Sequence, residues 1–340
     1  MAEMKAVKPW VGGADCLNTI RLLAAIEVLY GHAIVHLGIV DNPIIGGFIH
    51  YFAGVPIFFT LSGFLMCGSI LRSNSYKDYL KKRFWRIYPE LWLAVLIEVI
   101  VLLILYHQPI SWPQFSLFIF GQGTIFQFWT PDCLRAYGCG CPNGALWTIT
   151  VLIQFYIIAY PIYKYLHKKK FVVWLLFFVV SLAVSSLTPI IKGNTPEIVG
   201  KLYEATILPY LWMFILALML GEYKEQIIPF LKKYWPLFIL ATLLARNCGF
   251  DIRVSYLVLS TIFLILSVLG FGYRFPIFNV KTDISYGIYI YHMTVVNALI
   301  ALGYRNDYTL MLTVFIATVI FAWISTKTVG QWGLKMKKKK

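Results

Sequence analysis

Residues 16–39 read CLNTIRLLAAIEVLYGHAIVHLGI, a long apolar stretch that carries only two formally charged side chains. An α-helix needs about 20 mostly apolar residues to cross the hydrocarbon core of a bilayer, so this stretch predicts a transmembrane helix. Further runs of the same kind follow along the rest of the chain. The fold class that we expect is therefore all-α, a polytopic integral membrane helical bundle.

The overall composition agrees with this expectation. The chain has 340 residues, of which 59% are hydrophobic and 13% are charged, and its mean hydropathy is +0.72. Soluble domains are typically about 45–50% apolar and about 25% charged. These values exclude a soluble globular enzyme, a disordered tail and a secreted disulfide-rich miniprotein.

About ten spans are expected, in a single transmembrane domain that covers residues 1–340. The expected spans are 16–39, 47–71, 87–107, 145–165, 171–191, 204–221, 234–247, 255–272, 284–303 and 308–329. The span 234–247 is short for a membrane crossing. The aromatic stretch 113–129 is expected to lie along the outer face, within an outer loop 108–144. No cleavable signal peptide is evident, because the first apolar run is long and contains Arg21 and Glu27.

The basic residues predict the orientation of these spans. A net charge of +15 and a pI near 9.5 would suit a nucleic-acid-binding protein, but the charges lie in short clusters between apolar runs. With ten spans and a cytoplasmic N-terminus, 23 of the 30 Lys and Arg residues lie inside and six lie outside. This bias follows the positive-inside rule. We expect a multi-pass cell-membrane protein with both termini cytoplasmic, no nucleic-acid partner, and a basic tail 330–340 that contacts membrane lipids.

The first span contains several ionisable side chains, which are costly inside a membrane and often functional. Arg21 and His32 are eleven residues apart, so they share one helix face and are separated by about 16 Å along the axis. His36 lies on a similar face one turn beyond His32, whereas Glu27 lies on a different face. The stripe therefore predicts a cation near the cytoplasm and a proton acceptor farther out. The alternative is a snorkelling arginine and a hydrogen-bonded core histidine.

A second polar stripe lies in SYGIYIYH, residues 285–292. Ser285, Tyr289 and His292 recur at intervals of four and three residues, which places them on one helix face. The stripe either contributes to a site or forms a polar seam between helices.

The segment 72–89, RSNSYKDYLKKRFWRIYP, is strongly basic. Arg83 and Arg86 share a helix face, and guanidinium groups match phosphate geometry. They predict a site for a phosphate-rich cytoplasmic cofactor, unless they serve only as a topology signal.

Two further blocks supply polar groups. Ser62 and Gly63 in PIFFTLSGFLM (56–66) permit close helix packing or a kink. Trp147, Gln154 and Tyr156 lie in ALWTITVLIQFY (145–156), where Trp147 can also belong to an aromatic belt.

Taken in order, these blocks resemble the membrane-bound acyltransferase family 3. The resemblance rests on Arg21-x10-His32, FFTLSGF (58–64), RFWR (83–86), LWTITVLIQFY (146–156) and SYGIYIYH (285–292). It implies transfer of an acyl group, usually acetyl, from cytoplasmic acyl-CoA to a hydroxyl of a surface or lipid-linked glycan. Some relatives carry an extra periplasmic hydrolase-like domain; none is recognised in this sequence, so the resemblance implies that the membrane domain itself is expected to complete the transfer. No metal is expected.

The same resemblance assigns roles to individual residues. It makes His32 the catalytic histidine, with Arg21 as its companion, and assigns the CoA phosphates to Arg83 and Arg86. The supporting or substrate-binding candidates are Glu27, Ser62, Trp147, Gln154, Tyr156, Ser285, Tyr289 and His292. An imidazole with a pKa near 6.5 can take the proton of a sugar hydroxyl; whether His32 is that base or is itself acylated stays open.

One position departs from the family pattern. Relatives usually have an acidic residue two positions before Gln154, where this chain has Leu152. The acidic role is either dispensable or supplied elsewhere, with Glu27 and Asp132 as candidates; otherwise the catalytic inference is weakened.

The six cysteines divide between membrane and outer loops. Cys16 and Cys67 are expected to pack inside the membrane. The other four are expected outside, where they could form disulfides in three full pairings: Cys133, Cys139, Cys141 and Cys248.

The sequence is compatible with two other functions. A transporter or flippase for a lipid-linked glycan would suit ten spans with polar groups at mid-depth, and a non-catalytic partner in glycan assembly would suit the missing acid at Leu152. The acceptor sugar, the acyl length and the oligomeric state are not specified by the sequence.

Overall fold

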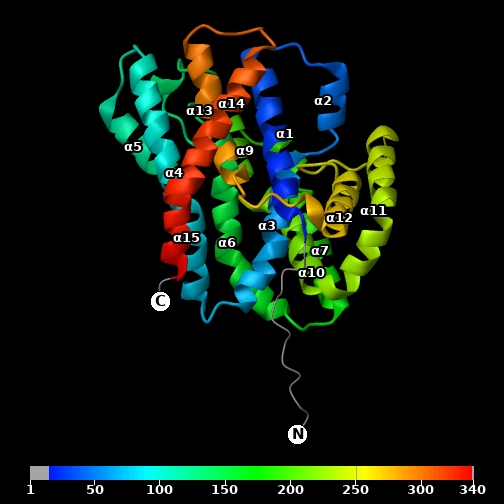
Figure 1. Cartoon of the computed structure of the whole chain (residues 1–340). Helices are drawn as coiled ribbons and strands as arrows, with labels where there is room; N and C mark the ends of the chain where they lie inside the picture. Colours follow the sequence, from blue (N-terminus) through cyan, green and yellow to red (C-terminus); the bar gives the residue numbers. More distant parts are fainter. Residues whose placement is uncertain (1–14, 250, 339–340) are drawn as a thin grey trace.

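The computed structural model describes residues 15–249 and 251–338, apart from the side chains of Phe48 and Lys338. Within these ranges the chain forms helices and no β-strand (Figure 1). Lys5, Lys8, Lys339 and Lys340, which contribute to the predicted inward charge bias, lie outside the described residues. The α-helices are α1 (Leu17–Leu37), α2 (Pro43–Ile49), α3 (Gly54–Leu71), α4 (Tyr76–Leu105), α5 (Trp112–Gln122), α6 (Trp147–Leu166), α7 (Phe171–Ser185), α8 (Thr188–Asn194), α9 (Glu197–Glu204), α10 (Leu211–Glu222), α11 (Lys224–Asn247), α12 (Val258–Arg274), α13 (Ser285–Ala301), α14 (Leu310–Ser325) and α15 (Gln331–Lys338).

The predicted fold class, a polytopic helical membrane bundle, is confirmed. Seven helical segments of the described chain are long and apolar enough to cross a membrane: Leu17–Leu37, Gly54–Leu71, Tyr76–Leu105, Gly144–Leu166, Phe171–Asn194, Lys224–Asn247 and Leu310–Lys337. The pair Glu197–Glu204 and Leu208–Glu222, bent by 56°, makes an eighth if it is one span. Helices α12 and α13 have only 17 residues each. The count of about ten spans therefore stays a prediction.

Several helices begin earlier or later than their hydropathy suggested. The second apolar run is divided, because residues 43–49 form the separate helix α2 and α3 begins only at Gly54. Helix α4 begins at Tyr76, well before the apolar run, because the Ser75 side chain accepts a hydrogen bond from the Asp78 amide and caps it. Helix α11 begins at Lys224, so the run 234–247 that looked short belongs to a helix of 24 residues.

Close packing of small residues holds the central helices together. Helix α1 packs against α13 and α3, and α3 packs against α10. A Cβ atom at Gly63 would lie 2.7 Å from the Ala217 Cβ atom, and one at Gly287 would lie 2.7 Å from the Ala322 Cα atom. Small residues at helix contacts let backbones approach in a membrane, where burial of apolar surface gives little driving force. Gly63 thus serves close packing, one of the two roles expected for it.

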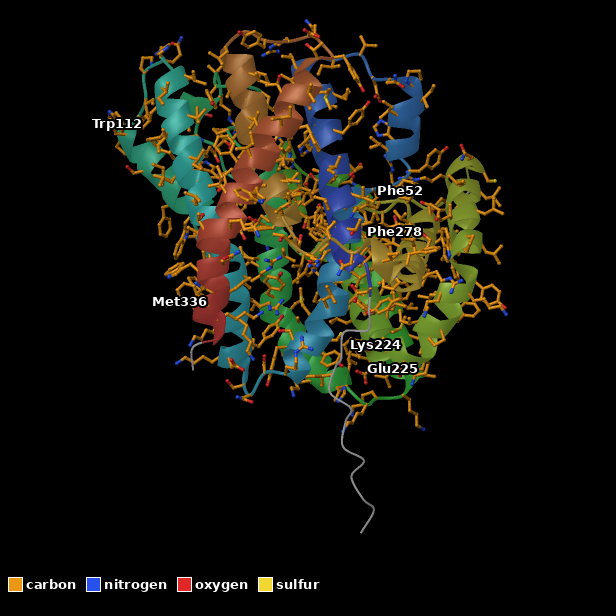
Figure 2. All side chains as sticks on the ribbon, viewed as in Figure 1. Phe52, Trp112, Lys224, Glu225, Phe278 and Met336 are labelled. Atoms are coloured by element: carbon orange, nitrogen blue, oxygen red, sulfur yellow. The ribbon has the colours of Figure 1, made fainter. Side chains whose placement is uncertain are left out.

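The linker between α12 and α13 crosses the molecule at about half its height, beside the beginning of α1 (Figure 1). The Cys16 amide donates to the Gly272 carbonyl at 2.8 Å, and the Asn18 side chain donates to the Val280 carbonyl at 3.3 Å. Lys224 and Met336 lie nearer the lower end of the molecule in Figure 2, and Trp112 lies nearer the upper end. The first turns of α1 and α13 are therefore set inside the bundle rather than at its lower surface.

Candidate active site

A cavity lies among α1, α3, α4, α6 and α13. About 80 Å³ of it is open to the centre of a water molecule, so it is too small to hold a nucleotide. Six of the residues expected at the site line it: Arg21, Ser62, Arg86, Tyr156, Ser285 and Tyr289. Side chains separated by up to 268 positions in the sequence are thus brought to one place.

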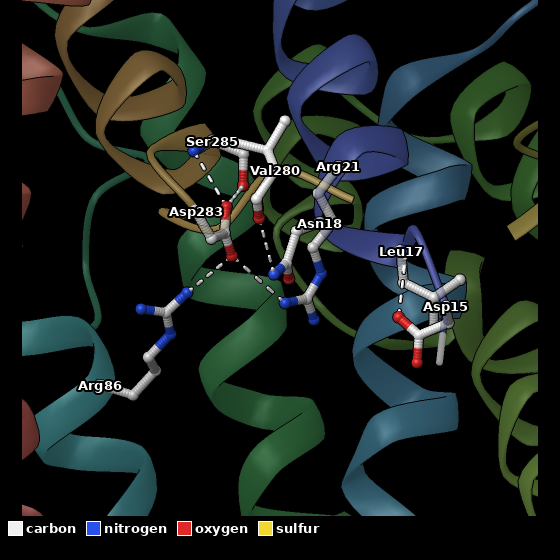
Figure 3. Close-up of polar contacts among 8 residues, drawn as sticks. All are labelled: Asp15, Leu17, Asn18, Arg21, Arg86, Val280, Asp283 and Ser285. Carbon is white, nitrogen blue, oxygen red and sulfur yellow. Dashed lines mark hydrogen bonds and ion pairs between the residues drawn. The ribbon is translucent and has the colours of Figure 1, made fainter. Parts of the chain in front are cut away.

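Asp283 joins the two arginines of this cavity (Figure 3). Its Oδ2 atom lies 3.0 Å from Arg86 Nη2 and 3.5 Å from Arg21 Nη1. Its Oδ1 atom accepts hydrogen bonds from the backbone and the hydroxyl of Ser285, at 3.1 and 2.5 Å. One carboxylate therefore ties α1 and α4 to the N-terminus of α13.

Asp283 was not among the residues that sequence reasoning selected. It lines the same cavity as Leu152, the position where relatives usually have an acid. The two carboxylates considered as substitutes are elsewhere: Glu27 accepts a hydrogen bond from the Gly54 amide at 2.8 Å, and the Asp132 side chain is fully exposed. The available signal was proximity in sequence, since Asp283 stands two residues before the 285–292 block.

Arg83 lies next to the cavity, against Tyr156. Its guanidinium stands 5.5 Å from the Tyr156 ring centroid and 5.6 Å from that of Tyr79, and it donates to the Ser69 hydroxyl at 2.5 Å. Its Nε atom is buried and has no hydrogen-bond partner among the described residues. A buried donor without a partner is costly, which makes this atom a candidate for binding an anion.

His32 and His292 form a direct pair on the outer side of the cavity. His32 Nδ1 lies 2.7 Å from His292 Nε2, and the two ring planes are nearly parallel, at 17°, with centroids 5.0 Å apart. His292 Nδ1 lies 3.2 Å from the Ile288 carbonyl oxygen, which can only accept a hydrogen bond. Neutral His292 must therefore carry its proton on Nδ1 and accept on Nε2. It follows that His32 donates from Nδ1 and keeps an unprotonated Nε2.

The cavity ends just before this histidine pair. Tyr289 lines it, and the Tyr289 ring touches that of His292 with centroids 5.9 Å apart. The Tyr289 hydroxyl accepts a hydrogen bond from Thr148 at 2.8 Å. The aromatic side chain of Tyr289 is thus the wall between the arginine-lined cavity and the imidazoles.

Trp147, Gln154 and Glu27 face other parts of the protein. The Trp147 ring packs on Tyr210, with centroids 5.5 Å apart. Gln154 bridges two backbone groups, donating to the Ala205 carbonyl at 2.7 Å and accepting from the Ile207 amide at 3.2 Å. These three side chains have structural partners and do not line the cavity.

The outer loop is held over α13 by Asn297. This side chain accepts a hydrogen bond from the Cys139 amide at 2.8 Å and donates to the carbonyls of Cys141 and Pro142 at 3.0 and 2.7 Å. All six cysteines lie in the described ranges and are free thiols, so none of the three possible disulfide pairings is present. Within those ranges, no group of three or more His, Cys, Asp or Glu side chains could hold a metal ion.

Comparison with known proteins identifies the class of this membrane bundle. A family model described as an acyltransferase domain matches residues 15–327. Nodulation protein 10 of Rhizobium leguminosarum bv. viciae is 27% identical over 359 aligned positions, which cover 96% of this chain and 95% of the relative. An O-acetyl transferase of Shigella phage Sf6 is 28% identical over 341 positions, which cover 92% and 93%. No solved structure matches the chain significantly.

The chain is thus a multi-pass membrane enzyme that transfers acyl groups. It belongs to the acyltransferase 3 family, as the resemblance of its sequence blocks predicted.

Proposed function

We propose that this protein is an O-acetyltransferase of the cell membrane that uses cytoplasmic acetyl-CoA and acetylates a hydroxyl of a surface or lipid-linked glycan. One observation carries the proposal: a single cavity is lined by two arginines, Arg21 and Arg86, and by Tyr289, whose ring touches that of His292 in the histidine pair. A relative named O-acetyl transferase supports the acetyl group. A relative named as a nodulation protein is in keeping with a carbohydrate acceptor.

The arginines are suited to the phosphates of the donor. Arg21 and Arg86 share one carboxylate, so together with Asp283 they keep a net positive charge. Arg83 adds a third guanidinium with a free buried Nε atom. In this proposal the nucleotide of acetyl-CoA stays at the cytoplasmic side, and its thin pantetheine arm follows the cavity toward Tyr289. Guanidinium groups bind phosphate more specifically than ammonium groups do, because of their fork geometry.

His32 then takes the proton from the acceptor. The acceptor oxygen forms a bond to the thioester carbonyl carbon while its proton passes to His32 Nε2. The tetrahedral intermediate breaks its carbon–sulfur bond, and the CoA thiolate leaves and recovers the proton from the imidazolium. His292 keeps His32 in the required tautomer by accepting from Nδ1. Positively charged His32 is stabilised by the same acceptor during the reaction.

The test follows radiolabelled acetyl-CoA into the glycan fraction of cell envelopes from the source organism, where O-acetyl esters are recognised by release in mild alkali. Membranes that contain the protein are expected to label this fraction. His32→Gln should abolish labelling, because the base is lost. His292→Leu should lower kcat by about 10²-fold, the lower range for general acid–base effects, with little change in the KM for acetyl-CoA.

His107→Gln serves as the control, because His107 is an exposed histidine just beyond the end of α4. It should transfer acetyl at the wild-type rate. Wild-type turnover by His32→Gln would reject the base assignment, and absence of any alkali-labile label with the wild-type protein would reject the proposed donor or acceptor.

A further inference from the structure

The C-terminal helix α15 lies beyond the part of the chain that the family model matches, which ends at residue 327. It continues from α14 through a π-helical turn, Thr326–Gly330, and packs along the lower half of α4 (Figure 1). A π-helical turn inside a helix frequently marks a functional region. The helix therefore lies against the helix that carries Arg83 and Arg86.

Specific contacts hold the turn and the helix in this position. Glu90 of α4 is buried and accepts hydrogen bonds from Thr326 at 3.1 Å and Ser325 at 3.4 Å. Trp332 meets Trp85 edge to face, with ring centroids 5.2 Å apart. A Cβ atom at Gly333 would lie 2.5 Å from the Trp85 carbonyl oxygen, so the two backbones are in direct contact. This close fit fixes the direction in which the last turn of α15 projects its side chains.

The packing of α15 against α4 brings several positively charged side chains close together. The ammonium group of Lys337 interacts electrostatically with four other cations: Arg72, Lys82, Arg83 and Arg86. Asp78 pairs with Lys82 at 2.7 Å, and Asp283 pairs with Arg86 at 3.0 Å.

Two members of this group have no carboxylate close by. Neither Arg83 nor Lys337 forms a salt bridge with an acidic residue in the described part of the chain. Like charges held together without counter-charges destabilise a fold. The packing of α15 against α4 nevertheless brings Lys337 to the other cations, and the buried Arg83 Nε atom is still without a partner. These observations indicate that a bound polyanion completes the cluster.

We propose that Lys337 is a donor-binding residue and that α15 forms one wall of a site for the phosphate groups of the nucleotide-tethered thioester. The inference rests on the proposed function. Acetyl-CoA carries a diphosphate and a ribose phosphate, which match a cluster of several cations. Lys335, on the same helix, is exposed, whereas Lys337 is partly buried. This difference favours a defined ligand over general attraction to lipid headgroups, which would use both lysines.

The experiment compares two donors with the purified protein in nanodiscs of zwitterionic lipid. One donor is acetyl-CoA, and the other is S-acetyl-pantetheine, which has the same thioester and no phosphate. Lys337→Gln is expected to raise the KM for acetyl-CoA about tenfold, the effect of losing one charge-assisted contact, without changing kcat. The KM for S-acetyl-pantetheine should stay unchanged. Lys335→Gln is the matched control and should behave as wild type, while Lys337→Arg should restore most of the affinity.

Several outcomes would overturn the proposal. Equal KM values for Lys337→Gln and Lys335→Gln would remove Lys337 from the site. An equal loss with both donors would show that the substitution only disturbs the fold. Effects of both variants that appear only in nanodiscs with anionic lipid would assign the lysines to lipid headgroups. The proposed function would fail in a different way, if the wild-type protein used acetyl-CoA no better than S-acetyl-pantetheine.

Discussion

Asp283 is the residue on which the arrangement of the cavity depends. Arg21 comes from α1 and Arg86 from α4, and two guanidinium groups so close together would repel each other without a carboxylate between them. Burial alone would raise the pKa of the Asp283 carboxyl. The guanidiniums of Arg21 and Arg86 and the hydrogen bonds from Ser285 outweigh burial and hold that pKa below its usual value. The carboxylate is therefore ionised at neutral pH.

We predict that Asp283→Asn destabilises the protein by about 3 kcal/mol, because it leaves two largely buried cations without their counter-charge. Thermal unfolding in detergent micelles measures this as a lower Tm. The stabilisation from Asp283 should be complete above its unfolded pKa of about 3.9 and be lost as the pH falls through its lower folded pKa. The difference in Tm between the wild-type protein and Asp283→Asn should thus be constant from about pH 8 to pH 5 and shrink only below about pH 4.

Asp307→Asn is a suitable control for this prediction. Asp307 also accepts a hydrogen bond from a backbone amide near a helix start, that of Thr309 at 2.8 Å, but its side chain is exposed. It should change the Tm only slightly. A Tm of Asp283→Asn equal to that of Asp307→Asn would mean that water already screens the arginine pair.

For individual residues, the sequence predicted part of the site. Arg21, chosen for its eleven-residue spacing from His32, lines the same cavity as Ser285 and Tyr289, which were chosen as one helical stripe. Such predictions succeed because helical periodicity fixes which side chains share a face. It could not select Asp283, since that residue lies in a linker with no periodicity. It also could not exclude Gln154, whose backbone partners come from a distant linker.

Among the helices, the contact between α4 and α15 allows a direct test of whether α15 positions Lys337 for the donor. Gly333→Val would place a branched side chain where even a Cβ atom meets the Trp85 carbonyl oxygen at 2.5 Å. Helix α15 should move away and carry Lys337 out of the proposed phosphate site. We predict that this variant raises the KM for acetyl-CoA about as much as Lys337→Gln, roughly tenfold, and that the double variant adds no further increase, because the two changes remove one interaction.

Gly193→Val is the control for Gly333→Val, because it also replaces a glycine within a helix by valine. A Cβ atom at Gly193, in α8, would meet nothing within 4 Å, so this substitution should leave the KM unchanged. If the effects of Gly333→Val and Lys337→Gln on the KM were independent and multiplied, α15 would act on the donor in some other way.

Helices were easier to predict than their boundaries. Each expected apolar run contains a helix, because length and hydropathy are properties of the run itself. The beginning of α4 at Tyr76 depends instead on a cap formed by Ser75 within a polar segment. Helix α11 retains Pro229 and Pro236 in its interior. Proline disfavours a helix interior but does not always end it, so the apolar run alone marked only part of this helix.

For the whole molecule, the predicted orientation can be tested with a thiol reagent that does not cross membranes. Cys248 is exposed at the end of α11, which is expected to face outward. It should react in intact cells. In a variant with Cys133, Cys139, Cys141 and Cys248 replaced by serine, the substitution Lys335→Cys should react only after the cells are permeabilised.

Unmodified Cys248 in intact cells, together with reaction of Lys335→Cys, would reverse the orientation. Reaction of both positions in intact cells would place the ends of α11 and α15 on the same side of the membrane and would change the number of crossings. The positive-inside rule predicts neither result, because 23 of the 30 basic residues lie on the expected inner side.

The start of α1 at about half the height of the molecule has a consequence for the proposed export of an acetyl group. About 16 Å separates Arg21 from His32 along one rigid helix, roughly half the 30 Å thickness of the hydrocarbon. In the proposed function, both ends of the route would belong to one helix, so export would require no rocking of domains and no alternating exposure of a carrier site. With acetyl-CoA as the proposed donor, the spent nucleotide would withdraw by the path along which it came, and the cell would lose only the two-carbon unit that it attaches outside.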